Sequence, residues 1–273
     1  MDDARTRKIK KVVAGNFDLS FAVYDEFERR YGFFADLSRS LAAFAGLSRG
    51  GRILDLGCGS GASSLILARE FDCRVVGIDL SARMIELGRN LIDDPRVELR
   101  IGDACAPRQA LDKGDADFDA AFYNASIFII PQAAESLKAA AACLKPGGIL
   151  AFSFYPEIRG PEGEDLFDTA FERLGEPRPR KQTITSYEEA LAGLRSHTSE
   201  IREGSHEKPF SEDFILDLFS IPAQSASLFP RLDYETRRSK VKELFATLEP
   251  ETATATIAWR LAAGKTSENG QLQ

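Results

Sequence analysis

Short apolar runs alternate with longer amphipathic segments through the middle of the chain. The runs lie at 53–56, 74–78, 97–101, 118–123 and 149–155, and the segments between them include 63–70, 82–91 and 131–144. Apolar runs of this length are typical of buried strands, whereas the longer segments are typical of helices. A regular alternation of strands and helices predicts an α/β domain whose parallel sheet is covered by helices on both faces.

A helical region precedes this core. Its aromatic residues recur on one helical face, which predicts a helical cap over 17–47 that is interrupted near Gly32. Residues 1–16 are expected to be mobile or loosely attached. The cap could simply pack on the sheet domain, or it could also cover a ligand with its aromatic face, and both can hold at once. The aromatic positions are Phe21, Tyr24, Phe27 and Tyr31.

The character of the sequence changes after Pro156, where short helical segments are separated by prolines and loops. We predict a substrate lid or insertion over 156–250, which includes a sixth strand at 198–208. The final strand of the core is expected within 251–263, and a disordered tail at 264–273. The core then covers 48–155, and the sheet has seven mostly parallel strands. A basic cluster at 178–181 is expected to be a solvated loop, with an anionic substrate contact as the alternative.

A glycine-rich turn follows the first strand, in the segment 52–62, Arg-Ile-Leu-Asp-Leu-Gly-Cys-Gly-Ser-Gly-Ala. Gly57 and Gly59 allow a tight turn that a ligand can approach closely, and Gly61 allows the following helix to pack near the strand. The pattern fits both a dinucleotide site and a G-x-G-x-G site. Asp55 favours the second, because a carboxylate would repel a bound pyrophosphate and stabilise a cation such as the sulfonium of S-adenosylmethionine.

The motif at 54–61 resembles the first motif of the class I S-adenosylmethionine-dependent methyltransferases. The turn at 144–148, Leu-Lys-Pro-Gly-Gly, precedes the fifth strand and resembles the same family. With the second and third strand ends, four matching motifs occur in order between Ile53 and Tyr155. The resemblance implies a Rossmann-like class I methyltransferase fold, methyl transfer and S-adenosylmethionine as cofactor.

Acidic residues end the next two strands. Asp79 lies about twenty residues beyond the glycines, where a carboxylate can accept hydrogen bonds from both ribose hydroxyls. In the family that the chain resembles, an acid at the position of Asp103 accepts from the adenine amine, and the next backbone amide reaches the ring. The full set of expected cofactor-binding residues is Asp55, Gly57, Cys58, Gly59, Gly61, Asp79, Leu80, Gly102, Asp103, Ala104, Tyr123 and Asn124.

Composition excludes several other functions. The net charge of −7 over 273 residues gives no support to a surface for nucleic acid. No signal peptide and no apolar stretch long enough to span a membrane are present, so we expect a cytoplasmic protein. The four cysteines form no C-x-x-C pair, and the two histidines lie apart from them, so we expect no metal site. We interpret the cysteines as reduced core residues, with a thiol role for Cys58 or Cys105 as the alternative.

The leading function is methyl transfer to a small, partly apolar acceptor, driven mainly by positioning and desolvation. The resemblance is loosely to the small-molecule branch that includes the quinone-biosynthesis methyltransferases. The segment 123–126 lacks the [DN]-P-P-Y motif, which argues against DNA or protein glutamine as acceptor. A non-catalytic S-adenosylmethionine-binding regulatory protein and an RNA or protein methyltransferase stay open, as do the acceptor and the oligomeric state. No catalytic residue is assigned, and the weak candidates for a general base are Tyr24, Tyr123, Tyr155 and His206.

Overall fold

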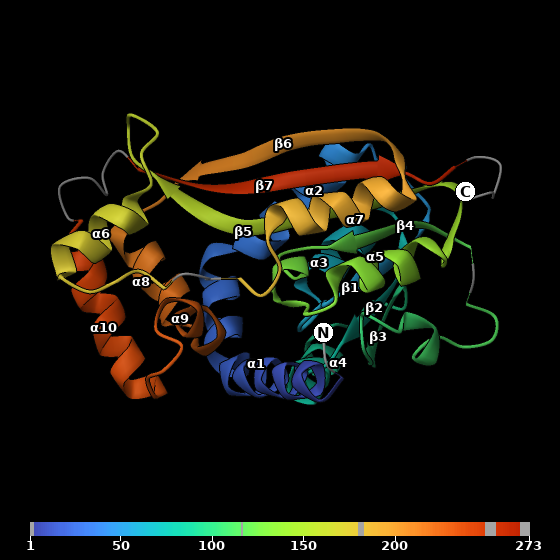
Figure 1. The fold of residues 1–273 in the computed structure, drawn as a ribbon. Coiled ribbons are helices and arrows are strands. Elements are labelled where there is room, and N and C mark those ends of the chain that lie inside the picture. Colours follow the sequence, from blue (N-terminus) through green and yellow to red (C-terminus); the bar gives the residue numbers. More distant parts are fainter. Residues whose placement is uncertain (1–2, 116, 180–182, 249–254, 268–273) are drawn as a thin grey trace.

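The computed structural model describes residues 3–115, 117–179, 183–248 and 255–267. Its centre is a seven-stranded sheet in the order β3-β2-β1-β4-β5-β7-β6 (Figure 1). Strands β1 to β5 are parallel, and β7 is antiparallel to both β5 and β6, which confirms the predicted fold class. The strands are β1 Arg52–Leu56, β2 Arg74–Asp79, β3 Val97–Ile101, β4 Phe118–Tyr123, β5 Leu144–Arg159, β6 Ser199–Pro209 and β7 Thr256–Lys265.

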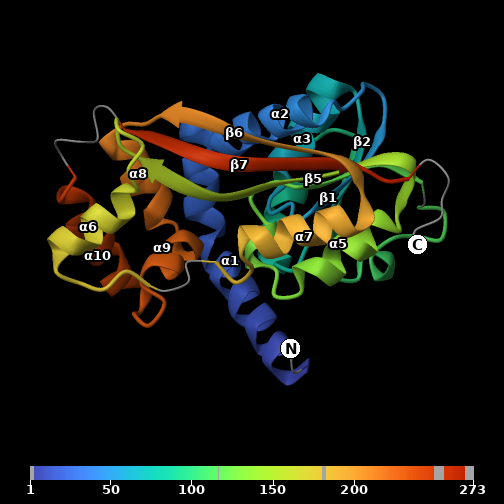
Figure 2. The ribbon, with the colours of Figure 1, turned by 45° about the horizontal axis from the view of Figure 1, so that its top comes forward.

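Helices cover both faces of the sheet (Figure 2). Helices α2 and α3 pack together on one face, and α5 and α7 pack together on the other. Local sequence signals set their starts: Ser81 caps α4 by accepting from the Met84 backbone, and Ser186 and Glu189 form a capping box at α7. The helices are α2 Phe33–Ala45, α3 Ala62–Phe71, α4 Ala82–Leu91, α5 Ala133–Ala141 and α7 Tyr187–His197, with 3₁₀ turns η1 Pro107–Gln109 and η2 Ile127–Ile129.

The N-terminal helix is longer than predicted. Helix α1 spans Asp3–Tyr31, so most of residues 1–16 are helical, while their expected mobility or loose attachment stays a prediction. Two polar contacts tie this part to the sheet domain: Lys10 pairs with Asp103, and the Asp18 carboxylate accepts from the Ser81 hydroxyl at 2.6 Å. Tertiary contacts of this kind are not visible in the local periodicity of a sequence.

Aromatic side chains join the cap to the sheet. Phe27 of α1 lies 6.2 Å from Phe33 of α2, and Phe33 lies 5.8 Å from Trp259 of β7, measured between ring centroids. Phe214 of α8 (Glu212–Ser220) lies 5.0 Å from Phe33. Burial of each such ring stabilises the fold by roughly 1.5–3 kcal/mol, so this cluster fixes the C-terminal half of α1 on the core.

A helical group lies beyond one end of the long strands β5, β6 and β7 (Figure 1). It consists of α6 Leu166–Leu174, α8, α9 Pro222–Leu228 and α10 Tyr234–Ala246. The region predicted as one lid over 156–250 is therefore divided, because α7 and β6 belong to the sheet layers. Strand β5 also passes through Pro156, where a register shift accommodates the residue without a ladder hydrogen bond.

The C-terminal strand is displaced from its predicted position. It runs to Lys265, so Gly264 and Lys265 belong to β7 and not to a disordered tail. Gly264 pairs with Leu150 of β5, which explains why the strand continues through a glycine. Residues 249–254 and 268–273, which include the start of the predicted strand and most of the predicted tail, lie outside the described residues.

Candidate functional site

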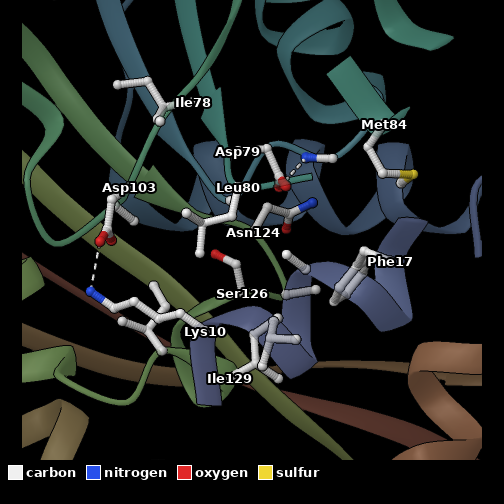
Figure 3. Close-up of a pocket in the computed structure, with 18 of the residues that line it drawn as sticks. Lys10, Phe17, Ile78, Asp79, Leu80, Met84, Asp103, Asn124, Ser126 and Ile129 are labelled. Carbon is white, nitrogen blue, oxygen red and sulfur yellow. Dashed lines mark hydrogen bonds and ion pairs between the residues drawn. The ribbon is translucent and has the colours of Figure 1, made fainter. Parts of the chain in front are cut away.

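A pocket opens at the carboxyl ends of β1, β2, β3 and β4, where the strand order reverses (Figure 3). Open parallel sheets bind ligands at such a switch point. Helix α1 forms the opposite wall. The lining residues are Lys10, Val13, Ala14, Phe17, Tyr24, Phe34, Gly57, Gly59, Ile78, Asp79, Leu80, Met84, Gly102, Asp103, Ala104, Asn124, Ala125, Ser126, Ile129, Ile130, Pro131 and Gln224.

The glycine loop after β1 forms the floor of the pocket. Gly57 and Gly59 have φ angles of 74° and 55°, and a Cβ on Gly57 would lie 2.5 Å from the Cβ of Ser126. Both features require glycine. Gly61 lies behind the loop, where its missing side chain leaves room for Ile92 and Leu99. Cys58 also points away from the pocket lining, and burial raises the pKa of its thiol, so no reactive thiolate is expected there.

Asp79 reaches the pocket from the end of β2. Its two carboxylate oxygens accept from the backbone amides of Gly59 at 2.9 Å and Ser81 at 2.8 Å. An ionised carboxylate has further lone pairs, so it can still accept from two ligand hydroxyls. Burial raises the pKa of Asp79, and the two backbone hydrogen bonds oppose that rise. The same carboxylate therefore shapes the glycine loop and faces the ligand space (Figure 3).

Asp103 faces α1 across the pocket (Figure 3). The Lys10 ammonium lies 2.6 Å from Asp103 Oδ2, and the backbone amide of Cys105 donates to Oδ1 at 2.9 Å. Burial lowers the pKa of Lys10, but the hydrogen bond and the charge of Asp103 outweigh it, so the pKa is raised. Lys10 therefore remains charged at neutral pH and holds α1 against the end of β3. Gly102 and Ala104, on either side of Asp103, also line the pocket.

Asp55 lies beneath the glycine loop and not in the pocket lining. It is fully buried, and its Oδ2 accepts from the Ser64 hydroxyl at 2.7 Å. Its Oδ1 has no hydrogen-bond partner among the described residues. Burial raises the pKa of Asp55 to about 7, with the Ser64 hydrogen bond opposing and the charge of Asp79 adding to the rise. An orphaned carboxylate oxygen at this point fits a cation or a water bound nearby.

The end of β4 contributes Asn124, whose amide donates to the Phe34 carbonyl and to the Ser63 hydroxyl. Tyr123 next to it points away, and its hydroxyl is bonded to Ser136 at 2.8 Å. Ala125 has a φ of 56°, an uncommon conformation for a residue with a Cβ. The strained residue lies in the pocket lining, where the surrounding structure must hold it in place.

Residues 53–148 match the family described as methyltransferase domain. This segment, which contains the glycine loop, Asp79 and Asp103, is therefore similar to methyltransferase domains. The 27-O-demethylrifamycin SV methyltransferase of Amycolatopsis mediterranei is 30% identical over 159 residues, which cover 58% of this chain and 57% of that protein. The ubiquinone/menaquinone biosynthesis C-methyltransferase of a Geobacter species is 33% identical over 128 residues, 46% of this chain and 54% of that protein.

Solved structures share the fold of this chain. Phosphoethanolamine N-methyltransferase 2 of Haemonchus contortus, in complex with phosphomonomethylethanolamine and S-adenosylhomocysteine, aligns with a TM-score of 0.54 and 19% identity. The alignment covers 85% of this chain and 52% of that one. The chain also spans about half the length of the curated relatives that it matches.

Of the four weak catalytic candidates, only Tyr24 lines the pocket. Burial raises its pKa well above 10, so its hydroxyl stays protonated at neutral pH. The Tyr155 hydroxyl is bonded to Ser227 at 2.7 Å, outside this pocket. His206 lies on the edge strand β6, with its Nε2 3.4 Å from Asp36 Oδ2, and burial lowers its pKa. The pocket at the switch point thus contains no histidine among its described lining residues.

The sequence predictions missed the wall that α1 contributes to the pocket. Lys10, Val13, Ala14 and Phe17 recur at helical spacing and continue toward Tyr24, so extending the aromatic stripe backwards would have found them. Gln224 of α9 was also missed, and nothing in its local sequence points to a ligand.

Two further features concern the described residues as a whole. No helix in this part of the chain is both long enough and apolar enough to cross a membrane. Within the same residues, no group of His, Cys, Asp and Glu side chains is arranged to hold a metal ion.

Proposed function

We propose that this chain transfers a methyl group from S-adenosylmethionine to a small, partly apolar acceptor. The observation that carries the proposal is the convergence of the glycine loop, Asp79 and Asp103 on one pocket that α1 covers. Apolar side chains complete the pocket, among them Phe17 and Ile129. The relatives named as methyltransferases of a rifamycin and of quinones support an acceptor of this kind.

The residues present fit the cofactor. Gly57 and Gly59 let the ligand approach the backbone, and Asp79 retains acceptor sites for ribose hydroxyls. Asp103 and Ala104 line the pocket after β3, where we propose that the adenine binds. When bound, S-adenosylmethionine supplies a methyl group activated by the positive charge of its sulfonium.

The protein contributes position and a dry environment. Helix α1 and η2 enclose the pocket with apolar side chains, which hold two reactants together and exclude water. Asn124, Ser126 and the backbone around Ala125 form a wall that internal hydrogen bonds keep rigid. Because Tyr24 stays protonated, no described group of the pocket is suited to act as a strong general base, and we propose catalysis mainly by positioning.

Parts of the helical group would act as a cover on the acceptor side. Helix α9 packs on α1 and places Gln224 in the pocket, and α10 packs on α8 and α9. Opening of this group would admit the acceptor, and amide hydrogen exchange should become slower in α8 to α10 when S-adenosylhomocysteine and acceptor bind.

The proposal is tested in two steps. Calorimetry should show binding of S-adenosylhomocysteine and none of NADH. Incubation with methyl-labelled S-adenosylmethionine and a metabolite extract of the host should then yield a labelled small molecule that mass spectrometry can identify. No binding of S-adenosylhomocysteine would refute the cofactor, and binding without any labelled product would refute methyl transfer to a metabolite.

A second candidate is a regulatory protein that binds the cofactor without catalysis. The acidic and basic groups of the pocket do not distinguish the enzyme from the regulatory protein, because a site without a general base is compatible with both functions. Turnover that depends on the acceptor separates them. Methylation of RNA is disfavoured by the net charge of −7, and a salt-sensitive affinity for RNA would revive it.

A further inference from the structure

Most polar side chains of the pocket are engaged within the protein. Asn124 and Ser126 donate to main-chain carbonyls, Asp79 accepts from two backbone amides, and Lys10 pairs with Asp103. Two pocket groups have no hydrogen-bond partner in the described part of the chain: the Tyr24 hydroxyl and the Gln224 side-chain amide.

Gln224 is the more unusual of the two because it is only 7% exposed. Its amide is not one of the fully enclosed side-chain groups that lack a partner in the described residues, so it is accessible from the pocket. Such a group can form its hydrogen bonds with water or with a ligand that occupies the pocket. The amide both donates and accepts, so it can bind either a carbonyl or a hydroxyl group.

The backbone around Gln224 is held on both sides. The preceding residue, Ala223, donates its backbone amide to the buried hydroxyl of Ser20 on α1 at 3.0 Å. The carbonyl of Gln224 accepts from Ser227 at 2.6 Å, and Ser227 is bonded to Tyr155 of β5. In the closed pocket, these hydrogen bonds hold helix α9 against α1 and the sheet, so the amide needs little reordering once the acceptor is enclosed.

The charges of the lining residues limit which kinds of ligand the pocket can bind. The charged groups among the described lining residues are Lys10, Asp79 and Asp103, which together carry a net single negative charge. Lys10 is already paired with Asp103, so it is not free for a phosphate or carboxylate. Bound S-adenosylmethionine has a net single positive charge, which balances the pocket. An anionic acceptor would then be buried without a counter-ion, and that is costly.

We propose that Gln224 selects the methyl acceptor, and that the acceptor is an uncharged, largely apolar molecule with a carbonyl or hydroxyl group near its methylated position. The inference rests on the proposed methyl transfer and adds the class of acceptor. It separates this chain from the Haemonchus contortus enzyme of similar fold, whose structure holds the phosphate-bearing phosphomonomethylethanolamine.

The test measures binding, so it does not depend on turnover. Matched pairs of esters and carboxylates serve as probes: methyl caffeate and caffeate, methyl salicylate and salicylate, methyl 3-hydroxyoctanoate and 3-hydroxyoctanoate. Each is titrated into protein saturated with S-adenosylhomocysteine, and ligand-observed NMR gives the dissociation constants. The variants are Gln224→Met, which keeps the length of the side chain, Gln224→Lys, which adds a cation, and Gln109→Met as a matched change at an exposed glutamine.

We expect at least one ester to bind the wild type about tenfold more tightly than its carboxylate, which corresponds to about 1.4 kcal/mol. Gln224→Met should weaken that ester by about tenfold, and Gln224→Lys should favour the carboxylate. Gln109→Met should change neither. Because Gln224→Met removes no side-chain hydrogen bond within the described part of the chain, its melting temperature should not fall.

Failure of every ester to bind more tightly than its carboxylate would overturn the inference, and so would an unchanged ester affinity in Gln224→Met. Titration of S-adenosylhomocysteine into the same proteins gives an independent readout. If the wild type does not bind S-adenosylhomocysteine, the proposed cofactor site is refuted. If it binds S-adenosylhomocysteine but does not prefer an ester over its carboxylate, only the role of Gln224 is refuted.

Discussion

Replacing Asp79 by alanine should show how much its carboxylate contributes to the stability of the glycine loop and how much to cofactor binding. The change removes acceptors for the backbone amides of Gly59 at 2.9 Å and Ser81 at 2.8 Å. Hydrogen bonds to a charged group contribute about 1.5–3 kcal/mol each, and water that enters the space of the removed carboxylate can recover some of this. We therefore expect the free energy of unfolding to fall by about 2–4 kcal/mol. If the carboxylate also binds the ribose hydroxyls, S-adenosylhomocysteine should bind roughly 10- to 150-fold more weakly.

A control must show that lost stability alone does not weaken binding. Asp119 serves this purpose, because its carboxylate also accepts a backbone amide, that of Arg52 at 2.7 Å, but at the opposite end of the sheet. Asp119→Ala should lower the free energy of unfolding by about 1–3 kcal/mol and leave the affinity for S-adenosylhomocysteine unchanged.

The assay is calorimetry of the wild type and both variants at a temperature where all three are folded, with urea denaturation for stability. Equal affinity of the wild type and Asp79→Ala would refute the assignment of the ribose to Asp79. A weakened affinity in Asp119→Ala would show that the loss in Asp79→Ala reports on stability.

Three further predictions follow from the site. Lys10→Met removes the ion pair with Asp103, so deuterium exchange in the first half of α1 should accelerate, and an unchanged rate would contradict the role of that pair. The pKa of Asp55 is raised to about 7 in the folded protein, so the folded state binds more protons than the unfolded state above pH 4. Between pH 5 and pH 8 its contribution to the free energy of unfolding should fall by about 2–3 kcal/mol, and urea denaturation should show that Asp55→Asn loses this part of the pH dependence. A last set of variants tests for a general base: Tyr24→Phe, Tyr123→Phe, Tyr155→Phe and His206→Ala. Each should lower turnover by about tenfold or less. A thousandfold loss in any of them, with intact cofactor affinity, would reveal a general base that we have missed.

The parts of the fold that the sequence predicts are those whose signals are local. A buried strand, a glycine turn and a capped helix follow one another within about twenty residues, so β1 to β4 and the loop at Gly57 could be placed from the pattern alone. The strand ends bring Asp79, Asp103 and Asn124 to one edge, because parallel strands end together at the switch point.

The local sequence does not determine the direction in which a side chain points at that edge. Asp55 and Asp79 both occur at the end of an apolar run, yet Asp55 is fully buried beneath the loop and Asp79 faces the pocket. Tyr123 and Asn124 are adjacent, and alternation along the chain sends only Asn124 into the lining. The contribution of Gln224 depends on how α9 packs against α1, a contact between residues about 200 positions apart.

The two halves of helix α1 are attached to the rest of the protein by different kinds of contact, and this difference affects how the pocket opens. Its C-terminal half carries Phe27 and Tyr31, whose rings pack against the aromatic cluster of α2 and α8. Its N-terminal half is held by polar contacts, Lys10 with Asp103 and Asp18 with Ser81. Partly exposed polar contacts contribute about 0–1 kcal/mol each, much less than the buried rings.

We therefore expect the N-terminal half to leave the pocket more readily than the other half, which the aromatic cluster anchors. Figure 2 shows this half extending away from the helical group. The segment that covers the expected adenine end is thus also the part of the helix that is most weakly attached. Such an arrangement admits a ligand without unfolding the cap, and it restores the enclosed pocket once the ligand is bound.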